Sequence, residues 1–324
     1  MLEDDIFACL TKEEFENLAL KVFQFQYRNT KVYREFCDFL NISPASVKKV
    51  VDIPFLPIEF FKNKVILAQG NSSEKIFTSS GTTGSVPSKH HVAKLNIYER
   101  SFNTAFDNVY GDPTEYCILA LLPSYLERED SSLVYMVDAL CKRSENAHSG
   151  FYMNNLYALT KQLMHQEETS KKTLLIGVSY ALLDLVEKNK FQLQNTTVLE
   201  TGGMKGRRKE LVKDELHEIL MDGFGVKSIH SEYGMTELLS QAYSQGNGVF
   251  NCPPWMKVLI RDTEDALTLT TGKTGGINII DLANIYSCSF IATQDLGELC
   301  PNGSFKILGR FDNSDIRGCN LMAL

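Results

Sequence analysis

The amino-acid sequence predicts an α/β fold with mostly parallel sheet layers and a smaller antiparallel subdomain. Between residues 116 and 221, short apolar runs typical of buried strands alternate with longer segments of helical periodicity. This alternation is typical of parallel strands joined by right-handed crossovers. After residue 250 the pattern changes to short strand-like segments separated by Gly and Asn, which favours antiparallel pairing.

The first 75 residues or so are expected to form a helical N-terminal region. Thr11 and Glu14 have the spacing of a capping box, and apolar residues follow at helical spacing. A second helix is expected over residues 31–40. The next segment, DIPFLPIEFFKNKVI (52–66), contains two prolines and is predicted to be an extended connector.

The central part of the chain is predicted to alternate regularly between strands and helices. Strands are expected at 116–122, 173–178 and 196–200, and helices at 132–140, 155–164, 180–188 and 209–221. The later antiparallel segments are expected to be WMKVLIRD, ALTLTT, GINIIDL and SFKILG. The chain is accordingly divided into a helical region (1–75), an ATP-binding α/β region (76–250), a β-rich subdomain (251–310) and a C-terminal tail (311–324).

Three polar, Gly-containing stretches each follow a predicted strand. TSSGTTG follows Phe77, TGGMKGRR follows Glu200, and SEYGMTE follows Ile229 and His230. In an open parallel sheet, ligands bind beyond the carboxyl ends of the strands. We therefore expect the three stretches to contribute to one shared site.

Composition excludes several classes of protein. The 324 residues are 44% hydrophobic and 23% charged, as in ordinary globular proteins, and the formal net charge of -7 disfavours nucleic-acid binding. No apolar run reaches membrane-spanning length, and the N-terminus is acidic where a signal peptide would be basic. A cytoplasmic protein without integral membrane association is expected.

Eight cysteines are present without any C-x-x-C pair or zinc-finger spacing, and most are expected to be buried small apolar residues.

The stretch TSSGTTGSVPSKHHV (78–92) has two interpretations. Clusters of Ser, Thr, Gly and Pro usually indicate a surface loop. Glycines also let backbone N–H groups approach an anion, while hydroxyls and a nearby lysine supply further donors, so the stretch is also compatible with a phosphate cradle.

Four motifs in order decide between these readings. TSSGTTG, EYGMTE, QDLGEL and GRFDNSDIRG span residues 78–318, and together they resemble the adenylate-forming enzymes: acyl- and aryl-CoA ligases, synthetase adenylation domains and luciferases. Two motifs depart from the usual pattern, since TGSVPSK displaces Lys89 and QDLG replaces the commoner T-G-D. The resemblance implies the large N-terminal domain of an adenylate-forming enzyme.

The resemblance also implies ATP and Mg²⁺ as ligands and a set of site residues. Thr236 would bond the α-phosphate, Glu237 would bind Mg²⁺, Tyr233 would lie against adenine, and Asp295 with Arg310 would hold the ribose. The phosphate and adenine contacts would further come from Thr78, Ser79, Ser80, Gly81, Thr82, Thr83, Gly84, Lys89, Gly202, Gly203 and Gly234.

Simpler readings exist for several of these residues. Thr236 and Glu237 could cap a helix, Asp295 could make a turn, and Tyr233 could be core. In TGGMKGRR the basic residues could be a solvated first turn of helix. Candidates for the acyl pocket, which core packing explains equally well, are His90, His91, Tyr125, Phe151, Tyr152 and Met235.

The chain ends where most adenylate-forming enzymes continue into a mobile C-terminal domain with a catalytic lysine, so that domain is expected to be absent. The sequence ends shortly after Arg317, Gly318 and Cys319, and an arginine beside a thiol lowers its pKa. The compact length, the IPFLPIEFFK connector, ETGGMKG and the terminal RGC resemble the acyl-protein synthetases of bacterial bioluminescence (LuxE type), which are allied to phenylacetate-CoA ligases.

This branch implies that a fatty acid is activated as acyl-AMP, transferred to Cys319 as a thioester, and passed to an acyl-CoA reductase-like partner protein. Two alternatives remain at this point: a phenylacetate-type acyl- or aryl-CoA ligase that lacks or borrows its C-terminal domain, and an inactive adenylation-fold scaffold.

Overall fold

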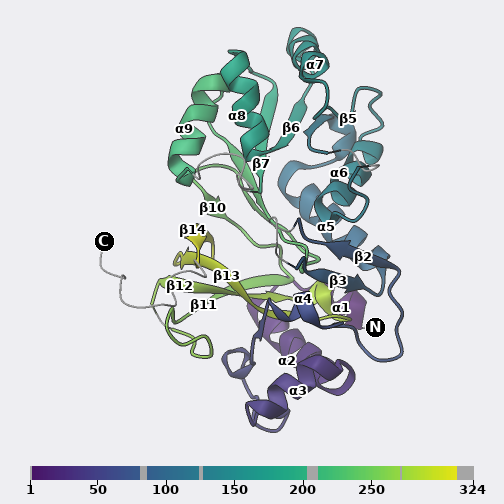
Figure 1. Ribbon diagram of the computed structural model, residues 1–324, viewed down its shortest axis with the longest axis vertical. Coiled ribbons are helices and arrows are strands. Elements are labelled where there is room, and N and C mark those ends of the chain that lie inside the picture. Colours follow the sequence, from purple (N-terminus) through teal and green to yellow (C-terminus); the bar gives the residue numbers. More distant parts are fainter. Residues whose placement is uncertain (1, 81–85, 124–126, 203–210, 271, 312–324) are drawn as a thin grey trace.

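The computed structural model describes residues 2–80, 86–123, 127–202, 211–270 and 272–311. Within these ranges the chain forms two six-stranded sheets and a separate two-stranded hairpin (Figure 1). No helix in the described ranges is long and apolar enough to cross a membrane.

The first sheet is the predicted parallel one, with strand order β5-β4-β6-β7-β8-β9. Its strands are β4 (Cys117–Leu121), β5 (Gly150–Phe151), β6 (Thr173–Val178), β7 (Thr196–Thr201), β8 (His230–Tyr233) and β9 (Ala242–Ser244). Pairing is parallel from β5 through β8, and β9 runs antiparallel to β8. Every residue of β4 and β6 is buried, as expected for strands with helices on both faces.

Five helices accompany this sheet: α5 (Leu95–Tyr110), α6 (Ser132–Arg143), α7 (Leu156–Glu168), α8 (Ser179–Lys188) and α9 (Lys213–Phe224). The last four confirm the predicted helices, whereas α5 was not predicted. Successive side chains of β8 point to opposite faces of the sheet. The Ser231 hydroxyl lies 3.3 Å from Nε2 of His217 in α9, whereas Glu232 is on the side of Tyr98 in α5. Helices α9 and α5 therefore cover opposite faces of the sheet (Figure 1).

The second sheet is antiparallel, as predicted, with order β10-β14-β13-β12-β11. Its strands are β10 (Val249–Phe250), β11 (Met256–Arg261), β12 (Thr274–Asp281), β13 (Phe290–Leu299) and β14 (Phe305–Arg310). A short strand from the N-terminal region, β1 (Leu56–Pro57), pairs in parallel with β13. The domain boundaries at 75, 250 and 310 stay predictions.

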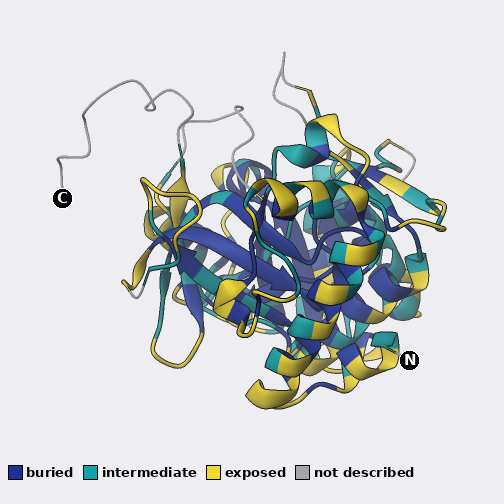
Figure 2. Cartoon of the chain, turned by 90° about the horizontal axis from the view of Figure 1, so that it is seen from below, coloured by how far each residue is buried: buried dark blue, intermediate teal, exposed yellow. Residues whose placement is uncertain are grey.

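The N-terminal helices pack on this second sheet. They are α1 (Leu2–Ala8), α2 (Lys12–Asn29) and α3 (Lys31–Phe39), and the capping box of Thr11 and Glu14 is present at the start of α2. Tyr33 of α3 stacks on Phe290 of β13 with ring centroids 5.9 Å apart. Exposed residues lie on the outer sides of these helices, and the strands behind them are buried (Figure 2).

Short elements complete the described chain: α4 (Phe60–Asn63), η1 (Val50–Asp52), η2 (Pro113–Glu115) and η3 (Leu282–Asn284). The connector predicted at 52–66 is thus extended only in part, because it contains β1 and α4.

One topological expectation was wrong. The TSSGTTG stretch follows β2 (Lys75–Thr78), which pairs antiparallel with β3 (Lys89–Val92) in a hairpin of its own. The stretch therefore connects two hairpin strands and does not follow a strand of the parallel sheet, although Thr78 is still fixed beside that sheet by contacts described below.

Candidate functional site

Hydrogen bonds join Ser79 and Ser88 near the two described ends of the Gly-rich stretch, and we call this joined base the neck of the stretch. The Ser79 N–H donates to the Ser88 carbonyl at 3.0 Å, and the Ser88 N–H donates to the Ser79 hydroxyl at 2.9 Å. The Thr78 N–H donates to the Asp130 carbonyl at 2.8 Å, and its hydroxyl donates to the Asp130 carboxylate. The Ser79–Ser88 bonds therefore keep the two ends of the stretch together. The Thr78–Asp130 bonds attach this base to the segment before α6.

The predicted loop residues differ in how far they can be placed. Ser80 and Lys89 are exposed at the two ends of the stretch. Gly81, Thr82, Thr83 and Gly84 lie outside the described residues, as do Gly203 and Cys319.

The segment after β8 is a turn, so the reading of Thr236 and Glu237 as a helix N-terminus is wrong. The Leu238 N–H donates to the Met235 carbonyl at 3.1 Å, and no helix follows. The buried carboxylate of Asp281, at the end of β12, accepts from the N–H groups of Leu239 at 2.8 Å and Ser240 at 3.0 Å. A segment of the parallel sheet is thus fixed by a side chain from the antiparallel sheet.

Glu237 is a buried carboxylate with 5% exposure. Burial raises its pKa, while a hydrogen bond from Ser88 and the positive charges of Arg310 and Lys62 act in the opposite direction. Ser88, at the base of the Gly-rich stretch, is therefore near the predicted metal ligand. Buried negative charge that is only partly compensated fits a hard divalent cation such as Mg²⁺, which prefers oxygen ligands.

Tyr233, Asp295 and Arg310 form one hydrogen-bonded group. The Tyr233 hydroxyl donates to Asp295 Oδ2 at 2.7 Å, and Arg310 Nε donates to Asp295 Oδ1 at 2.9 Å. Asp295 lies inside β13 opposite Arg310 of β14, so the reading of Asp295 as a turn residue is wrong. The Tyr233 ring packs on Phe250 and Phe305, so it also belongs to the hydrophobic packing between the sheets.

Gly202 and Gly234 lie at the ends of β7 and β8. Gly202 has φ +69°, which favours glycine, and its carbonyl accepts from the Ser179 hydroxyl at 2.6 Å. A Cβ on Gly234 would lie 2.4 Å from Oε1 of Glu232, so a larger residue there would displace that carboxyl group.

Two buried glutamates flank these glycines and have opposite pKa shifts. Burial raises the pKa of Glu232 to about 7, opposed by a hydrogen bond from Thr201 and reinforced by the charge of Glu200. Burial acts the same way on Glu200, but hydrogen bonds and charge from His217 and Lys213 lower its pKa to about 2. Neither glutamate was identified from the sequence.

The candidate acyl-pocket residues are not brought together. His90 is buried beneath Thr236, whereas His91 faces Ser73 with its Nδ1 3.0 Å from the hydroxyl. Phe151 lies in β5, which three strands separate from β8. Tyr152 follows that strand and donates to the His148 carbonyl, and Tyr125 lies outside the described residues.

Most described cysteines are buried, as predicted. Cys9, Cys37, Cys117, Cys141 and Cys288 are buried, and Cys252 and Cys300 are half-buried. Burial raises the pKa of Cys117 to about 11 and that of Cys37, Cys141 and Cys252 to about 12, so these thiols are poor nucleophiles at neutral pH.

The sequence matches a described family and two curated relatives. A family model for "Acyl-protein synthetase, LuxE" matches residues 9–323. The long-chain-fatty-acid–luciferin-component ligase of Vibrio harveyi is 24% identical over 331 residues, covering 96% of this chain and 87% of that protein. A protein of the same description from Photorhabdus luminescens is 31% identical over 70 residues, covering 21% of this chain and 60% of that protein.

Solved structures of adenylate-forming enzymes share the fold. A 2-hydroxyisobutyryl-CoA ligase, in complex with 2-HIB-AMP and CoA, superposes with a TM-score of 0.66 at 11% identity, covering 94% of this chain and 77% of that one. ATP-bound MatB from Rhodopseudomonas palustris gives a TM-score of 0.54 at 16% identity, covering 72% of this chain and 47% of that one.

Proposed function

Since the chain belongs to the acyl-protein synthetase (LuxE) family of ligases, we propose that it activates a fatty acid with ATP and transfers the acyl group to a cysteine thiol. The observation that carries this proposal is the joining of three predicted segments. His90 of the hairpin that carries the Gly-rich stretch lies 2.8 Å from the Thr236 carbonyl oxygen, and Tyr233 before the same turn donates to Asp295 of the antiparallel sheet.

The first step is adenylation. A carboxylate oxygen of the fatty acid attacks the α-phosphorus of ATP, the bond from that phosphorus to the bridging oxygen breaks, and pyrophosphate leaves with the bonding electrons. The products are acyl-AMP and pyrophosphate. Negative charge accumulates on the phosphate oxygens during this step, so the protein must supply donors that are already oriented.

The proposed donors form two groups, one at the α-phosphate and one at the β- and γ-phosphates of ATP. The Thr236 hydroxyl donates to the α-phosphate, while the Gly-rich stretch and Lys89 hold the β- and γ-phosphates. This second group comprises Ser80, Gly81, Thr82, Thr83, Gly84 and Lys89, whereas Thr78 and Ser79 bond Asp130 and Ser88 and hold the base of the stretch.

The nucleoside is proposed to lie between the ends of the sheets. Asp295 and Arg310 hold the ribose hydroxyls, Tyr233 faces adenine, and Gly202, Gly203 and Gly234 leave room for the base. Mg²⁺, when bound with ATP, neutralises phosphate charge, and the buried Glu237 carboxylate is its proposed protein ligand.

The second step is thioester formation. The Cys319 thiolate attacks the acyl carbon of acyl-AMP, the carbon–oxygen bond to phosphate breaks, and AMP leaves. The raised pKa values of Cys37, Cys117, Cys141 and Cys252 disfavour those thiols as acceptors, which supports Cys319 in this role. The acyl group is proposed to pass from Cys319 to an acyl-CoA reductase-like protein.

Intact-mass spectrometry after incubation with ATP, Mg²⁺ and fatty acids tests this function. We expect a hydroxylamine-labile acyl adduct on Cys319, which is lost in Cys319→Ala and kept in Cys300→Ala, a matched change of another cysteine that is not fully buried. AMP release only on addition of coenzyme A, without an adduct, would instead identify a CoA ligase. Absence of ATP binding would identify an inactive scaffold.

A further inference from the structure

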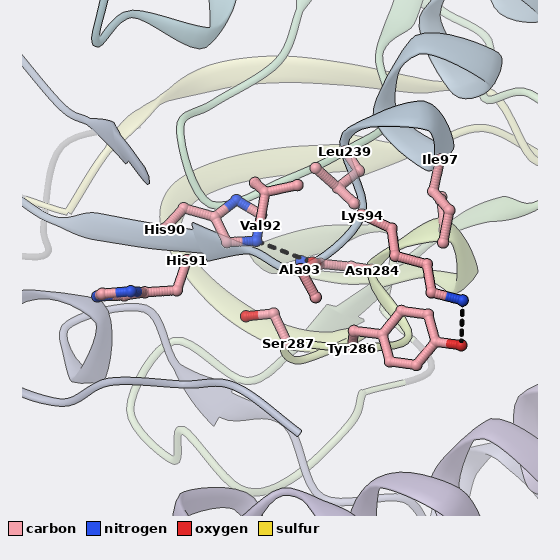
Figure 3. Close-up of a pocket in the computed structure, with 11 residues that line it drawn as sticks. His90, His91, Val92, Ala93, Lys94, Ile97, Leu239, Asn284, Tyr286 and Ser287 are labelled. Atoms are coloured by element: carbon pink, nitrogen blue, oxygen red, sulfur yellow. Dashed lines mark hydrogen bonds between the residues drawn. The ribbon is translucent and has the colours of Figure 1, made fainter. Parts of the chain in front are cut away.

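A buried histidine lies directly beneath the Thr236–Glu237 turn. His90, in β3, is fully buried, and its Nδ1 lies 2.8 Å from the Thr236 carbonyl oxygen. Its Nε2 lies 3.0 Å from Oδ1 of Asn284, a residue of η3 in the antiparallel half of the molecule. Figure 3 shows the His90 ring turned toward Asn284, whereas His91 points the other way from the same strand.

Asn284 also contacts Glu237, the residue after Thr236. Its Nδ2 donates to the Glu237 carbonyl at 2.7 Å, which fixes the amide so that Oδ1 faces His90. His90 and Asn284 thus hold two consecutive carbonyl groups, those of Thr236 and Glu237. Asn284 is held in turn, because Gln26 of α2 donates to its main-chain carbonyl at 3.0 Å.

Core packing alone does not require the polar contacts of His90 with Thr236 and Asn284. An apolar side chain would fill the space against Phe61, whose ring meets His90 edge-on at 5.7 Å, without any buried polar atom. Burial lowers the pKa of His90 to about 4, so the ring is neutral near pH 7 and carries one N–H between two acceptor oxygens. A hydrophobic residue at this position would leave the buried Thr236 carbonyl and the Asn284 Oδ1 without this partner.

We propose that His90 is a positioning residue of the adenylation site, which together with Asn284 fixes the main chain of Thr236 and Glu237 relative to the Gly-rich stretch. The connection is direct, because β3 begins at the residue after Ser88 and His90 is the second residue of that strand. The Thr236 hydroxyl and the Glu237 carboxylate are thereby held at a constant distance from the phosphate-binding side. This inference rests on the proposed function.

Three substitutions of His90 separate positioning from packing. His90→Asn places an amide donor near the position of Nδ1 and preserves the contact with Thr236, whereas His90→Leu removes all polarity. His90→Gln places its amide near Nε2 and preserves only the contact with Asn284. The probes are Mg·ATP binding by calorimetry and acid-dependent ATP–pyrophosphate exchange, with thermal unfolding measured for every variant.

We expect His90→Leu to weaken Mg·ATP binding at least tenfold and to lower kcat of exchange further. The variant should stay folded with a lower unfolding temperature, because the buried Thr236 carbonyl loses its partner. His90→Asn should remain within about threefold of the wild type in binding. If His90→Leu does not fold, His90→Gln replaces it under the same criterion. His230→Asn, which removes a half-buried histidine bonded to Tyr110 at the opposite end of β8, should leave both readouts unchanged.

Two results would overturn the inference: wild-type binding and exchange in His90→Leu, or a His90→Asn variant no better than His90→Leu. Failure of the proposed function is seen separately. A wild-type protein that binds Mg·ATP but shows no acid-dependent exchange would contradict acid activation, while the binding series would still decide the role of His90.

Discussion

Buried carboxylates at the site differ in what compensates their charge. Asp281 accepts hydrogen bonds from Leu239 and Ser240, and Asp295 is paired with Arg310, so both are held by fixed donors. For Glu237, Ser88, a main-chain N–H and the charges of Arg310 and Lys62 lower the pKa, but burial outweighs them and the pKa is raised. Among these three, Glu237 is therefore the carboxylate best suited to a metal ion supplied with the nucleotide.

Replacing Glu237 by Gln should separate activity from stability. Removing the charge eliminates the proposed metal ligand, so we expect the rate of acid-dependent exchange to fall roughly 100-fold. The unfolding temperature should be unchanged or higher, because burial of the ionised group is unfavourable. Glu264→Gln, at an exposed position, serves as the control, and an unchanged exchange rate in Glu237→Gln would contradict its assignment.

Glu232 should make stability depend on pH. Its pKa of about 7 lies above the unfolded value of 4.5, so the folded protein holds a proton that the unfolded chain releases. The resulting stability is fully present below pH 4.5 and is lost as the pH rises through 7. Chemical denaturation should show the wild type losing on the order of 3 kcal/mol relative to Glu232→Gln between pH 5 and pH 8.

Parallel pH profiles for the wild type and Glu232→Gln would show that Glu232 is ionised in the fold. Glu200 does not contribute in this window, because its pKa of about 2 keeps it charged throughout.

A local motif points to residues by their chemistry, and on that basis Thr236, Glu237 and Tyr233 are proposed as site residues. It does not identify the residues that hold them. Asn284 contacts Glu237 across 47 positions, and His90 contacts Asn284 across 194. No local spacing encodes such contacts, so the roles of His90, Asn284 and Asp130 emerge only when the sheets are assembled.

Among the elements, the β2–β3 hairpin depends on an anchor outside itself. Thr78 at the end of β2 bonds Asp130 through both its main chain and its hydroxyl. Asp130 is in turn bonded by Arg128 Nε at 3.0 Å. The hairpin is therefore attached to the segment that leads into α6.

Asp130→Ala should loosen this attachment at small cost to the fold. The Thr78 hydroxyl loses its acceptor, so we expect KM for ATP in the exchange assay to rise about tenfold and the free energy of unfolding to fall by about 1 kcal/mol. Asp138→Ala removes an aspartate from a surface pair with Lys142 in α6 and is the matched control. Equal KM values for the two variants would show that Asp130 does not position the stretch.

Helix α2 supports the site from the far side of the antiparallel sheet. The Gln26 amide donates to the carbonyls of Asn284 and Ile285, and its oxygen accepts from the Ser289 N–H at 3.0 Å. Gln26→Leu should reduce the free energy of unfolding by about 2–3 kcal/mol, because buried main-chain groups lose their partners. Gln24→Leu, the same change on the exposed face of α2, should cost less than about 0.5 kcal/mol in urea denaturation.

A helix can be missed even when its periodicity is present. In α5 the buried residues Ile97, Tyr98, Ser101, Phe102, Ala105 and Phe106 follow helical spacing. The segment LNIYERSFNTAFDNVY carries this pattern, but it is rich in Asn, Tyr and Phe, which are weaker helix formers than Ala or Leu. Counting matches to the helical template would have identified α5.

At the scale of the whole molecule, the parallel pairing of the central strands and the change to antiparallel pairing were predictable from periodicity, whereas the spatial order of the strands was not predicted. The relation between the two sheets was not, because it depends on contacts such as Asp281 with Ser240 and Tyr233 with Asp295. The candidate site lies where these contacts meet, with parts drawn from the hairpin, the end of β8 and three strands of the antiparallel sheet.

The contacts that hold Asn284 also bear on how the protein is synthesised. Gln26 reaches Asn284 across 258 positions, and His90 reaches it across 194. Contacts of such sequence separation form slowly and late in folding. A nascent chain that has emerged only as far as Glu237 has the proposed phosphate-binding stretches and His90 but lacks Asn284, so nucleotide binding should begin only after η3 and β13 leave the ribosome. ATP binding would therefore report completion of the fold during translation.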